Sequence, residues 1–225
     1  MGWGADLMSM QSTRVPEFTL AIDTSAGTSV AVLSMGSVLA EVNYLEPMTH
    51  AERIGSAIAE VLSKASLEAD EISLVVVGVG PGPFTGLRVG LAAAQFFALG
   101  ANADLVGVCS LDAIALDYYK KYPSDASLLV TTDARRKEIF WASYQGVKDS
   151  IPIRVTGPMV NKEVDVENFI TVETHQRTDI VVRAGALGEI AFAQMLTDLG
   201  PNYDVTPIYL REPDAVPGKA KRVSG

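Results

Sequence analysis

The segment LVVVGVGPGPFTGLRVGLAAAQFFAL, residues 74–99, decides how the chain folds. Its beginning, Leu74 to Val79, is apolar and rich in β-branched residues, which predicts a strand buried on both faces of a sheet. The strand must end at the Gly-Pro-Gly-Pro sequence of residues 80–83, because these residues favour turns and proline donates no backbone hydrogen bond. Thr85 then suits the cap of a helix over residues 86–99, since its hydroxyl can accept from an unpaired N–H of the first turn.

Small residues recur at every fourth position of this predicted helix, at Gly86, Gly90, Ala94 and Ala98. Glycine in a helix costs roughly 1 kcal/mol relative to alanine, so two glycines on one stripe indicate a packing reason. We therefore predict that another backbone lies very close to this stripe.

The composition describes a protein with a large core and an acidic surface. The chain has 225 residues, of which 48% are hydrophobic and 20% charged, and its formal net charge is −9. This charge argues against an extended nucleic-acid surface, because phosphate binding needs clustered Lys and Arg. The local exceptions are 135–137 (Arg-Arg-Lys) and, in the tail, Lys219, Lys221 and Arg222.

The sequence also indicates a compartment. The single cysteine, Cys109, cannot form an intrachain disulfide and fits a reducing environment. No stretch reaches roughly 18 uninterrupted apolar residues, so we expect no membrane contact and a cytoplasmic protein. Residues 1–18 lack the apolar run of a signal peptide, and we expect them to form a flexible, dispensable extension.

Hydrophobic periodicity predicts a first half that alternates between strands and helices. The expected elements are strands at 19–25, 28–35, 38–45, 72–79 and 105–108, and helices at 50–65, 86–99 and from Ser110 or Asp112 to 121. Short turns between the first three strands predict an antiparallel meander. The order βββαβαβα predicts a mixed sheet flanked by helices, as in the ribonuclease-H-like fold and in each half of the actin-like ATPase fold.

A second, truncated half of the same kind is expected after a linker at 123–125. Its predicted elements are strands at 127–133, 138–145, 151–156 and 179–183, a helix at 187–199 and an irregular tail from 201. Little room for a helix remains between 157 and 179. We therefore predict an α/β protein with subdomains at 19–122 and 123–225.

Common catalytic motifs fail on residue type. The G-x-G-x-x-G pattern that starts at Gly80 ends on Thr85, and a P-loop would need Lys where Leu87 follows Gly86. A ribonuclease H metal site could use Asp23 and Glu52, but the strand 74–79 supplies no acid.

Metal ligands and nucleophiles are equally sparse. His50 and His175 lie far apart in the sequence without neighbours of zinc-ligand type. Cys109 follows a strand and is interpreted as a core residue. We predict neither catalytic residues nor a metal site.

Two turns correspond to the phosphate-binding turns of actin-like ATPases but are degenerate. The first, Asp23-Thr24-Ser25, keeps an acid and two hydroxyls, yet Ser25 stands where such turns usually have glycine. The second begins at Asp133 and continues as Ala-Arg-Arg-Lys without a glycine. Side chains there should obstruct close approach of the backbone to phosphate.

Taken together, the residues resemble the bacterial TsaB (YeaZ-type) family of tRNA threonylcarbamoyladenosine synthesis. The matching segments are LAIDTS at 20–25, HAER at 50–53, GVGPGPFTGLRVG at 78–90, DARRKEIFWASY at 133–144 and PIYLREPDA at 207–215. The resemblance implies a non-catalytic subunit that binds a TsaD-type catalytic partner through its first two helices, works with a TsaE-type ATPase, and meets tRNA only indirectly through the complex. It implies no cofactor in the isolated chain. A nucleotide (ATP or ADP) at the subunit junction and a homodimer of the isolated chain stay open.

The predicted partner-binding residues lie on those two helices. They are His50, Ile54, Ala57, Ile58, Val61, Leu62, Gly86, Leu87, Gly90 and Ala94. The alternatives are an active ATPase or kinase of the actin-like superfamily, which would have to bind ATP and magnesium as the isolated chain, and a glycoprotease-like peptidase, for which the sequence offers no nucleophile–base pair.

Overall fold

The computed structural model describes residues 15–45, 50–166, 174–178, 182–198 and 200–211. The tail beyond Arg211 and most of the extension 1–18 lie outside these residues. The extension ends inside a strand, because Phe18 is the first residue of β1.

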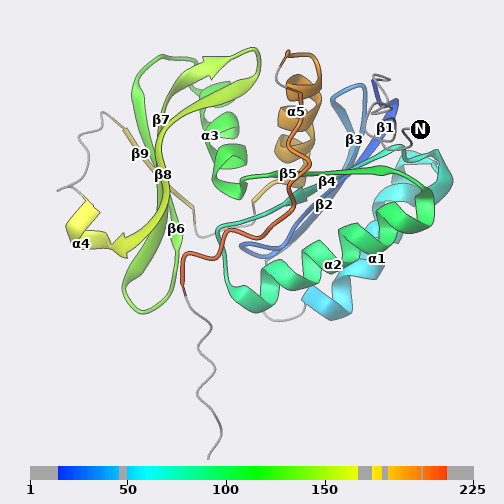
Figure 1. The fold of residues 1–225 in the computed structure, drawn as a ribbon, viewed down its shortest axis with the longest axis horizontal. Helices are drawn as coiled ribbons and strands as arrows, with labels where there is room; N and C mark the ends of the chain where they lie inside the picture. Colours follow the sequence, from blue (N-terminus) through cyan, green and yellow to red (C-terminus); the bar gives the residue numbers. More distant parts are fainter. Residues whose placement is uncertain (1–14, 46–49, 167–173, 179–181, 199, 212–225) are drawn as a thin grey trace, which may run out of the picture.

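The first half forms the predicted mixed sheet, and its five strands lie in the order β3-β2-β1-β4-β5 (Figure 1). Its strands are β1 (Phe18–Asp23), β2 (Thr28–Ser34), β3 (Ser37–Tyr44), β4 (Leu74–Gly78) and β5 (Asp104–Val108). The first three strands are an antiparallel meander, whereas β1, β4 and β5 run parallel. The parallel pairs require crossover connections, which the helices supply.

Helices cover both faces of this sheet. On one side lie α1 (His50–Ala65) and α2 (Phe84–Ala101), and on the other lie α3 (Ser110–Lys121) and α5 (Ala184–Met195). β4 contributes to both cores, with Val75 and Val77 facing α1 and α2, and Leu74 and Val76 in the cluster of α3 and α5. This burial on two faces is what the apolar run of β4 predicts.

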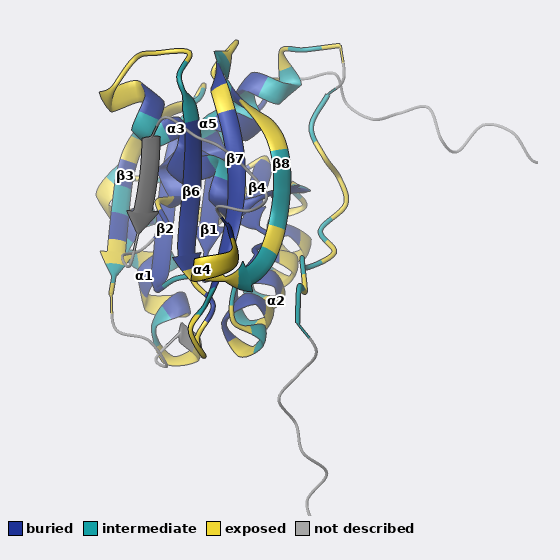
Figure 2. Ribbon diagram, turned by 90° about the vertical axis from the view of Figure 1, so that its left-hand side faces the viewer, coloured by how far each residue is buried: buried dark blue, intermediate teal, exposed yellow. Residues whose placement is uncertain are grey.

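The second half forms a four-stranded sheet in the order β8-β7-β6-β9. Its strands are β6 (Ser127–Asp133), β7 (Glu138–Lys148), β8 (Ile151–Lys162) and β9 (Thr174–Thr178). Helices α3 and α5 lie between the two sheets, and the one described helix that follows β8 before β9 is the short α4 (Glu163–Val166) (Figures 1 and 2). The second half is therefore truncated, as predicted, although the boundary between subdomains at 122 and 123 stays a prediction.

Polar contacts anchor α5, a helix of the second half, on the first sheet. The backbone N–H of Ala184 donates to Ser29 Oγ at 2.8 Å, and that of Gly185 donates to Glu41 Oε1 at 2.9 Å. Arg183 also pairs with Glu41 at 2.8 Å and with Asp117 at 3.1 Å. The unpaired N–H groups of the first helical turn are thus satisfied by strands β2 and β3.

Several predicted boundaries differ from the structure. Helix α2 begins at Phe84 after Pro83, so Thr85 lies inside the first turn and is not the cap. Helix α5 spans 184–195 rather than 187–199, and the strand expected at 179–183 is found at 174–178, while 179–181 lie outside the described residues. Strand β8 runs six residues further than predicted, through a glycine and a proline that suggested a loop.

The tail is irregular from Gly200 to Arg211, as expected, but it is held firmly. Asn202 accepts from the backbone N–H of Gly107 at 2.8 Å, and the N–H of Ile208 donates to the carbonyl oxygen of Val79 at 2.8 Å. Arg211 donates to the carbonyl oxygen of Ala134 at 2.7 Å. The tail therefore crosses from the end of β4 to the turn after β6.

Candidate functional site

The first candidate site is the turn that follows β1, where Asp23 is completely buried. Asp23 Oδ1 accepts from the backbone N–H of Ser25 at 2.8 Å and from its hydroxyl at 2.6 Å. Asp23 Oδ2 accepts from Ser110 Oγ at 2.6 Å. Burial raises the pKa of Asp23, and the hydrogen bonds from Ser110 and Ser25 oppose that shift in part. The carboxylate is thus bound by groups of its own chain.

Neighbouring backbone fills the space around this turn. A side chain on Gly78 would collide with the Asp23 carboxylate, and a Cβ on Gly82 would lie 2.9 Å from the Cα of Ser25. Thr24 donates to the carbonyl oxygen of Gly86 at 2.8 Å. The Gly-Pro-Gly-Pro segment and the start of α2 therefore pack directly on the turn.

The second turn lies at the end of β6 in the other sheet. Asp133 is exposed, and its Oδ1 accepts from the backbone N–H of Arg135 at 2.7 Å. Asp23 and Asp133 thus occupy equivalent positions at the ends of the first strands of the two halves, but their hydrogen bonds are to different partners. Between the two turns runs the tail segment that bonds Val79 and Ala134.

The glycine stripe of α2 packs inside the chain, which corrects its predicted role as a partner-binding surface. A side chain on Gly90 would collide with the Thr24 hydroxyl, and Gly86 is buried beside it. Leu87 and Ala94 are fully buried in the core beneath α2. The backbone predicted to lie close to the stripe is therefore the β1–β2 turn of this same chain.

The predicted face of α1 is likewise turned mostly inward. Ile54, Ala57 and Val61 are buried against the sheet, whereas Ile58 and Leu62 are half-buried at its margin. These residues follow the helical period because they form the core. The side chain of His50 lies outside what the structure describes.

The outward face of the same two helices carries apolar residues that the sequence argument missed. On α2, Phe96 is 75% exposed and Leu99 is 79% exposed. On α1, the exposed positions include Ala51, Gly55 and Ala59, and a Cβ at Gly55 would meet nothing within 4 Å. We call these five residues the outer helix face. A helical projection that first assigns Leu87, Leu91, Ala94 and Ala98 to the core would have found Phe96 and Leu99.

Helices α1 and α2 pack against each other and lie side by side below the first sheet (Figures 1 and 2). By length and composition α2 is the one helix, among the described residues, that could cross a membrane. Its buried stripe packs on β4 and on the turn after β1 instead. The outer helix face is therefore the open side of a core helix pair.

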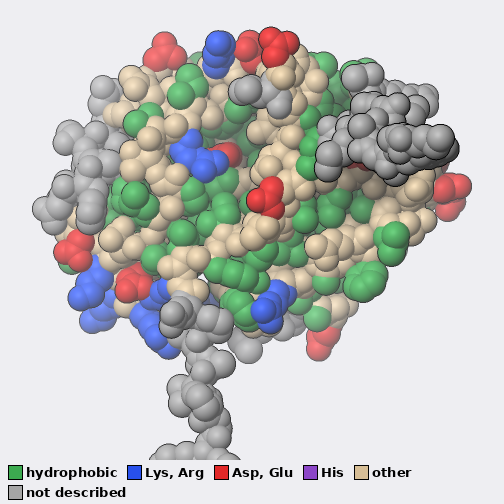
Figure 3. Space-filling model, in the orientation of Figure 1, with side chains coloured by type: hydrophobic (Ala, Val, Ile, Leu, Met, Phe, Trp, Pro, Cys, Tyr) green, Lys and Arg blue, Asp and Glu red, His purple; other side chains and the backbone are tan. Residues whose placement is uncertain are grey.

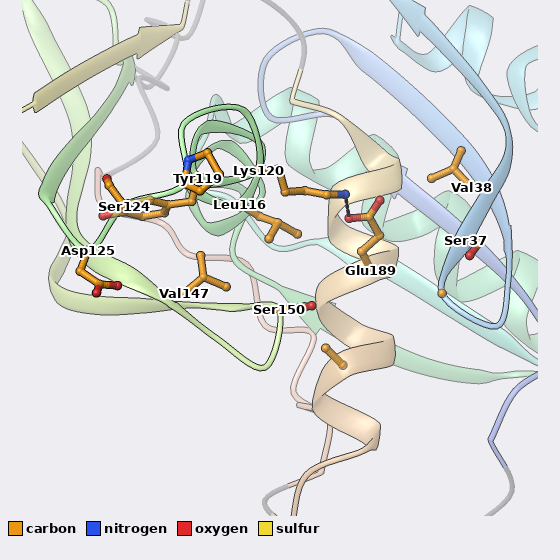
Figure 4. Close-up of a pocket in the computed structure, with 13 residues that line it drawn as sticks. Ser37, Val38, Leu116, Tyr119, Lys120, Ser124, Asp125, Val147, Ser150 and Glu189 are labelled. Atoms are coloured by element: carbon orange, nitrogen blue, oxygen red, sulfur yellow. Dashed lines mark hydrogen bonds and ion pairs between the residues drawn. The ribbon is translucent and has the colours of Figure 1, made fainter.

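A cavity of about 840 Å³ lies at the end of the strands that is opposite to the turns after β1 and β6, between α3, α5 and the turn from β2 to β3 (Figure 4). Tyr119, Asp125 and Ser150 are among its lining residues, and Lys120 and Glu189 form an ion pair within it. Neither degenerate nucleotide turn opens into this cavity, because Asp23 and Asp133 lie at the far ends of β1 and β6. Within the described ranges, no three His, Cys, Asp or Glu side chains are grouped to hold a metal.

Comparison with known proteins shows the family to which the chain belongs. A family profile described as "TsaD: tRNA N6-adenosine threonylcarbamoyltransferase" matches residues 46–210. An uncharacterized protein of Mycobacterium tuberculosis is 34% identical over 211 residues, which cover 88% of this chain and 93% of that protein. The Escherichia coli tRNA threonylcarbamoyladenosine biosynthesis protein TsaB is 36% identical over 133 residues, or 59% of this chain.

The structural comparison agrees on the fold. YeaZ from Pseudomonas aeruginosa superposes with a TM-score of 0.74 at 22% identity, covering 86% of this chain and all of that one. The sequence match spans only 57% of the E. coli TsaB and 56% of a Mycobacterium leprae relative. The activity and the partners of these relatives are therefore treated as proposals for this chain.

Proposed function

Because the chain belongs to the TsaB/YeaZ-type proteins within the threonylcarbamoyltransferase family, we propose that it takes part in tRNA threonylcarbamoyladenosine biosynthesis as a non-catalytic subunit. In this proposal it binds a TsaD-type catalytic partner and supports transfer of the threonylcarbamoyl group to tRNA with a TsaE-type ATPase. A cytoplasmic location follows from that role.

The observation that carries the proposal is the exposure of the apolar residues of the outer helix face. Phe96 and Leu99 near the C-terminal end of α2 and the small exposed residues of α1 are the positions on which we propose that another helix packs. Burial of a Leu or Phe side chain contributes roughly 1.5–3 kcal/mol, so an apolar partner would be stabilised here. In the absence of that partner, a second copy of the chain is proposed to occupy the same face.

The proposed lack of catalysis rests on the turn after β1. Asp23 is bonded to Ser25 and Ser110, and backbone occupies the space where a phosphate would approach. We propose that any nucleotide of the complex is bound outside this turn, for example at the junction with the partner.

The test is reconstitution. The TsaD-type and TsaE-type proteins of the same organism, an unmodified tRNA transcript, an activated threonylcarbamoyl donor and ATP are combined with and without this chain, and modified adenosine is measured by mass spectrometry. We expect the product only when the chain is present. Equal product without it contradicts the proposal, as does ATP turnover by the isolated chain that disappears in Asp23→Ala.

A further inference from the structure

The turn between β6 and β7 concentrates positive charge on a chain whose net charge is −9. Arg135, Arg136 and Lys137 are consecutive and exposed, and the side chain of Arg135 is 68% exposed. Figure 3 shows Lys and Arg side chains gathered at the lower left of this view, where Figure 1 places the end of β6. The role proposed above makes no use of this turn.

The backbone of the turn is unusual and well held. All three residues have a left-handed backbone, with φ of 64° at Arg135, 55° at Arg136 and 62° at Lys137. The N–H of Ala134 donates to the carbonyl oxygen of Glu138, and the N–H of Glu138 donates to that of Arg135, each at 3.0 Å. A fixed turn presents its cations without a further ordering cost when a ligand binds.

Two more cations extend the charge along the same edge. Arg211 bonds the carbonyl oxygen of Ala134 at 2.7 Å and pairs with Glu138. The second cation is Arg88, whose Nε donates to the hydroxyl of Tyr209, two residues before Arg211 in the tail, at 3.3 Å. Contacts therefore connect the turn to α2 through the tail.

Aromatic rings lie beside Arg88. The guanidinium of Arg88 lies 3.7 Å from the centre of the Phe84 ring, and that ring lies 4.7 Å from the ring of Tyr209. We call Arg88, Arg135, Arg136, Lys137 and Arg211 the basic ridge. Phe84 is half-buried and Tyr209 is exposed, and cations next to accessible aromatic rings are typical of surfaces that bind nucleic acid.

We propose that the basic ridge contacts the phosphate backbone of the tRNA, an inference that rests on the proposed function. Asp133 pairs with Arg135 and Glu138 pairs with Arg211, and the ridge gathers five cations on a chain whose net charge is −9. Such a local concentration of positive charge attracts and orients a polyanion. The tRNA contact is then direct, and not only through the catalytic partner as the sequence resemblance implied.

The experiment measures tRNA affinity of the assembled complex with its TsaD-type partner as a function of salt concentration. The variant is Arg135→Asn with Lys137→Asn, because asparagine tolerates the left-handed backbone and removes the charge. Each lost phosphate contact reduces the slope of log affinity against log salt by about 0.7–0.9, so the double variant should lose about 1.4–1.8 and bind tRNA at least about 25-fold more weakly near 0.1 M salt. Lys137→Asn alone should show about half of the slope change.

The matched control is Lys121→Asn with Lys148→Asn, which removes two exposed cations from the opposite end of α3 and β7. We expect this control to keep the wild-type slope, and both variants to form the complex normally. An unchanged slope and affinity in Arg135→Asn with Lys137→Asn would overturn the proposal for the ridge while leaving the subunit role intact. No tRNA binding by the wild-type complex would overturn both.

Discussion

The hydroxyl of Thr24 donates a 2.8 Å hydrogen bond to the carbonyl oxygen of Gly86, and the same hydroxyl occupies the space where Gly90 would carry a side chain. The turn after β1 and helix α2 are therefore in contact at a point where a side chain on residue 90 would collide with Thr24. This contact holds α2 against the turn after β1. The glycine stripe thus packs within this chain, and we expect substitutions in it to change the stability of the fold first.

The first prediction concerns Gly90→Ala. A methyl group there would collide with Thr24 Oγ1, and overpacking of this kind costs roughly 1–3 kcal/mol, which the better helix propensity of alanine offsets by up to about 1 kcal/mol. We expect a net loss of stability in urea denaturation. The control on the same helix is Gly100→Ala, where a Cβ meets nothing within 4 Å and stability should rise slightly. A Gly90→Ala protein at least as stable as Gly100→Ala would contradict the packing argument.

The second prediction concerns the pH dependence of stability through Asp23. Burial raises the pKa of this carboxyl in the folded state, so the folded protein holds the proton more tightly than the unfolded chain. This contribution to stability is complete below the unfolded pKa, about 3.9, and is lost as the pH rises through the folded-state pKa.

Asp23→Asn has no titrating carboxyl at this position, so the loss of stability with rising pH should be absent in this variant. We therefore expect the stability of the variant relative to wild type to increase with pH from about 4 upward. Denaturation midpoints measured across acidic and neutral pH check this. A difference between the two proteins that stays constant, or that decreases with pH, would show that Asp23 is not held by burial in the way the structure indicates.

The third prediction concerns the single thiol. Cys109 is buried, and burial raises its pKa to about 12. Because the thiolate is the reactive form, the native protein should resist iodoacetamide at pH 8, and denaturant should expose one reactive thiol per chain. Mass spectrometry counts the alkylated product. Rapid labelling of the native protein would place Cys109 at the surface and reopen a reactive role.

The first sheet could be predicted from the sequence because the residue composition of its strands and turns indicates the fold locally. β4 has no polar residue to mark a solvent face, and the short turns around Gly27 and Gly36 allow little besides a meander. The direction of the α2 stripe could not be predicted, since glycine and alanine are compatible with either a core contact or a partner. The contact with Thr24 determines the direction in which the stripe faces, and Thr24 lies 62 positions before Gly86 in the chain.

The second half was less predictable for a different physical reason. β8 continues through Gly157 and Pro158, which usually end a strand, because it is an edge strand and needs hydrogen bonds on one side only. Likewise α5 starts three residues early, since the strands of the other half supply its first hydrogen-bond acceptors at Ser29 and Glu41. Such long-range partners leave no local signal in the sequence.

The last prediction tests the outer helix face with Phe96→Asp combined with Leu99→Asp. Both side chains are more than two-thirds exposed, so the fold should tolerate the change, and thermal melting should stay near that of wild type. A partner helix packed on this face would instead lose two apolar contacts and bury two carboxylates. That loss is at least about 3 kcal/mol, or about 100-fold in affinity. Sedimentation should therefore show a monomer alone and little complex with the TsaD-type partner.

The control places the same charges on exposed apolar residues elsewhere, with Val155→Asp on β8 and Val164→Asp on α4, which are 62% and 80% exposed. This control adds the same net charge, so a general electrostatic effect on association would appear in both double variants. We expect the control to assemble like wild type. Equal assembly of the Phe96 and Leu99 variant would exclude the outer helix face as the interface. Loss of assembly in both variants would point to the added charge, and not to the position, as the cause.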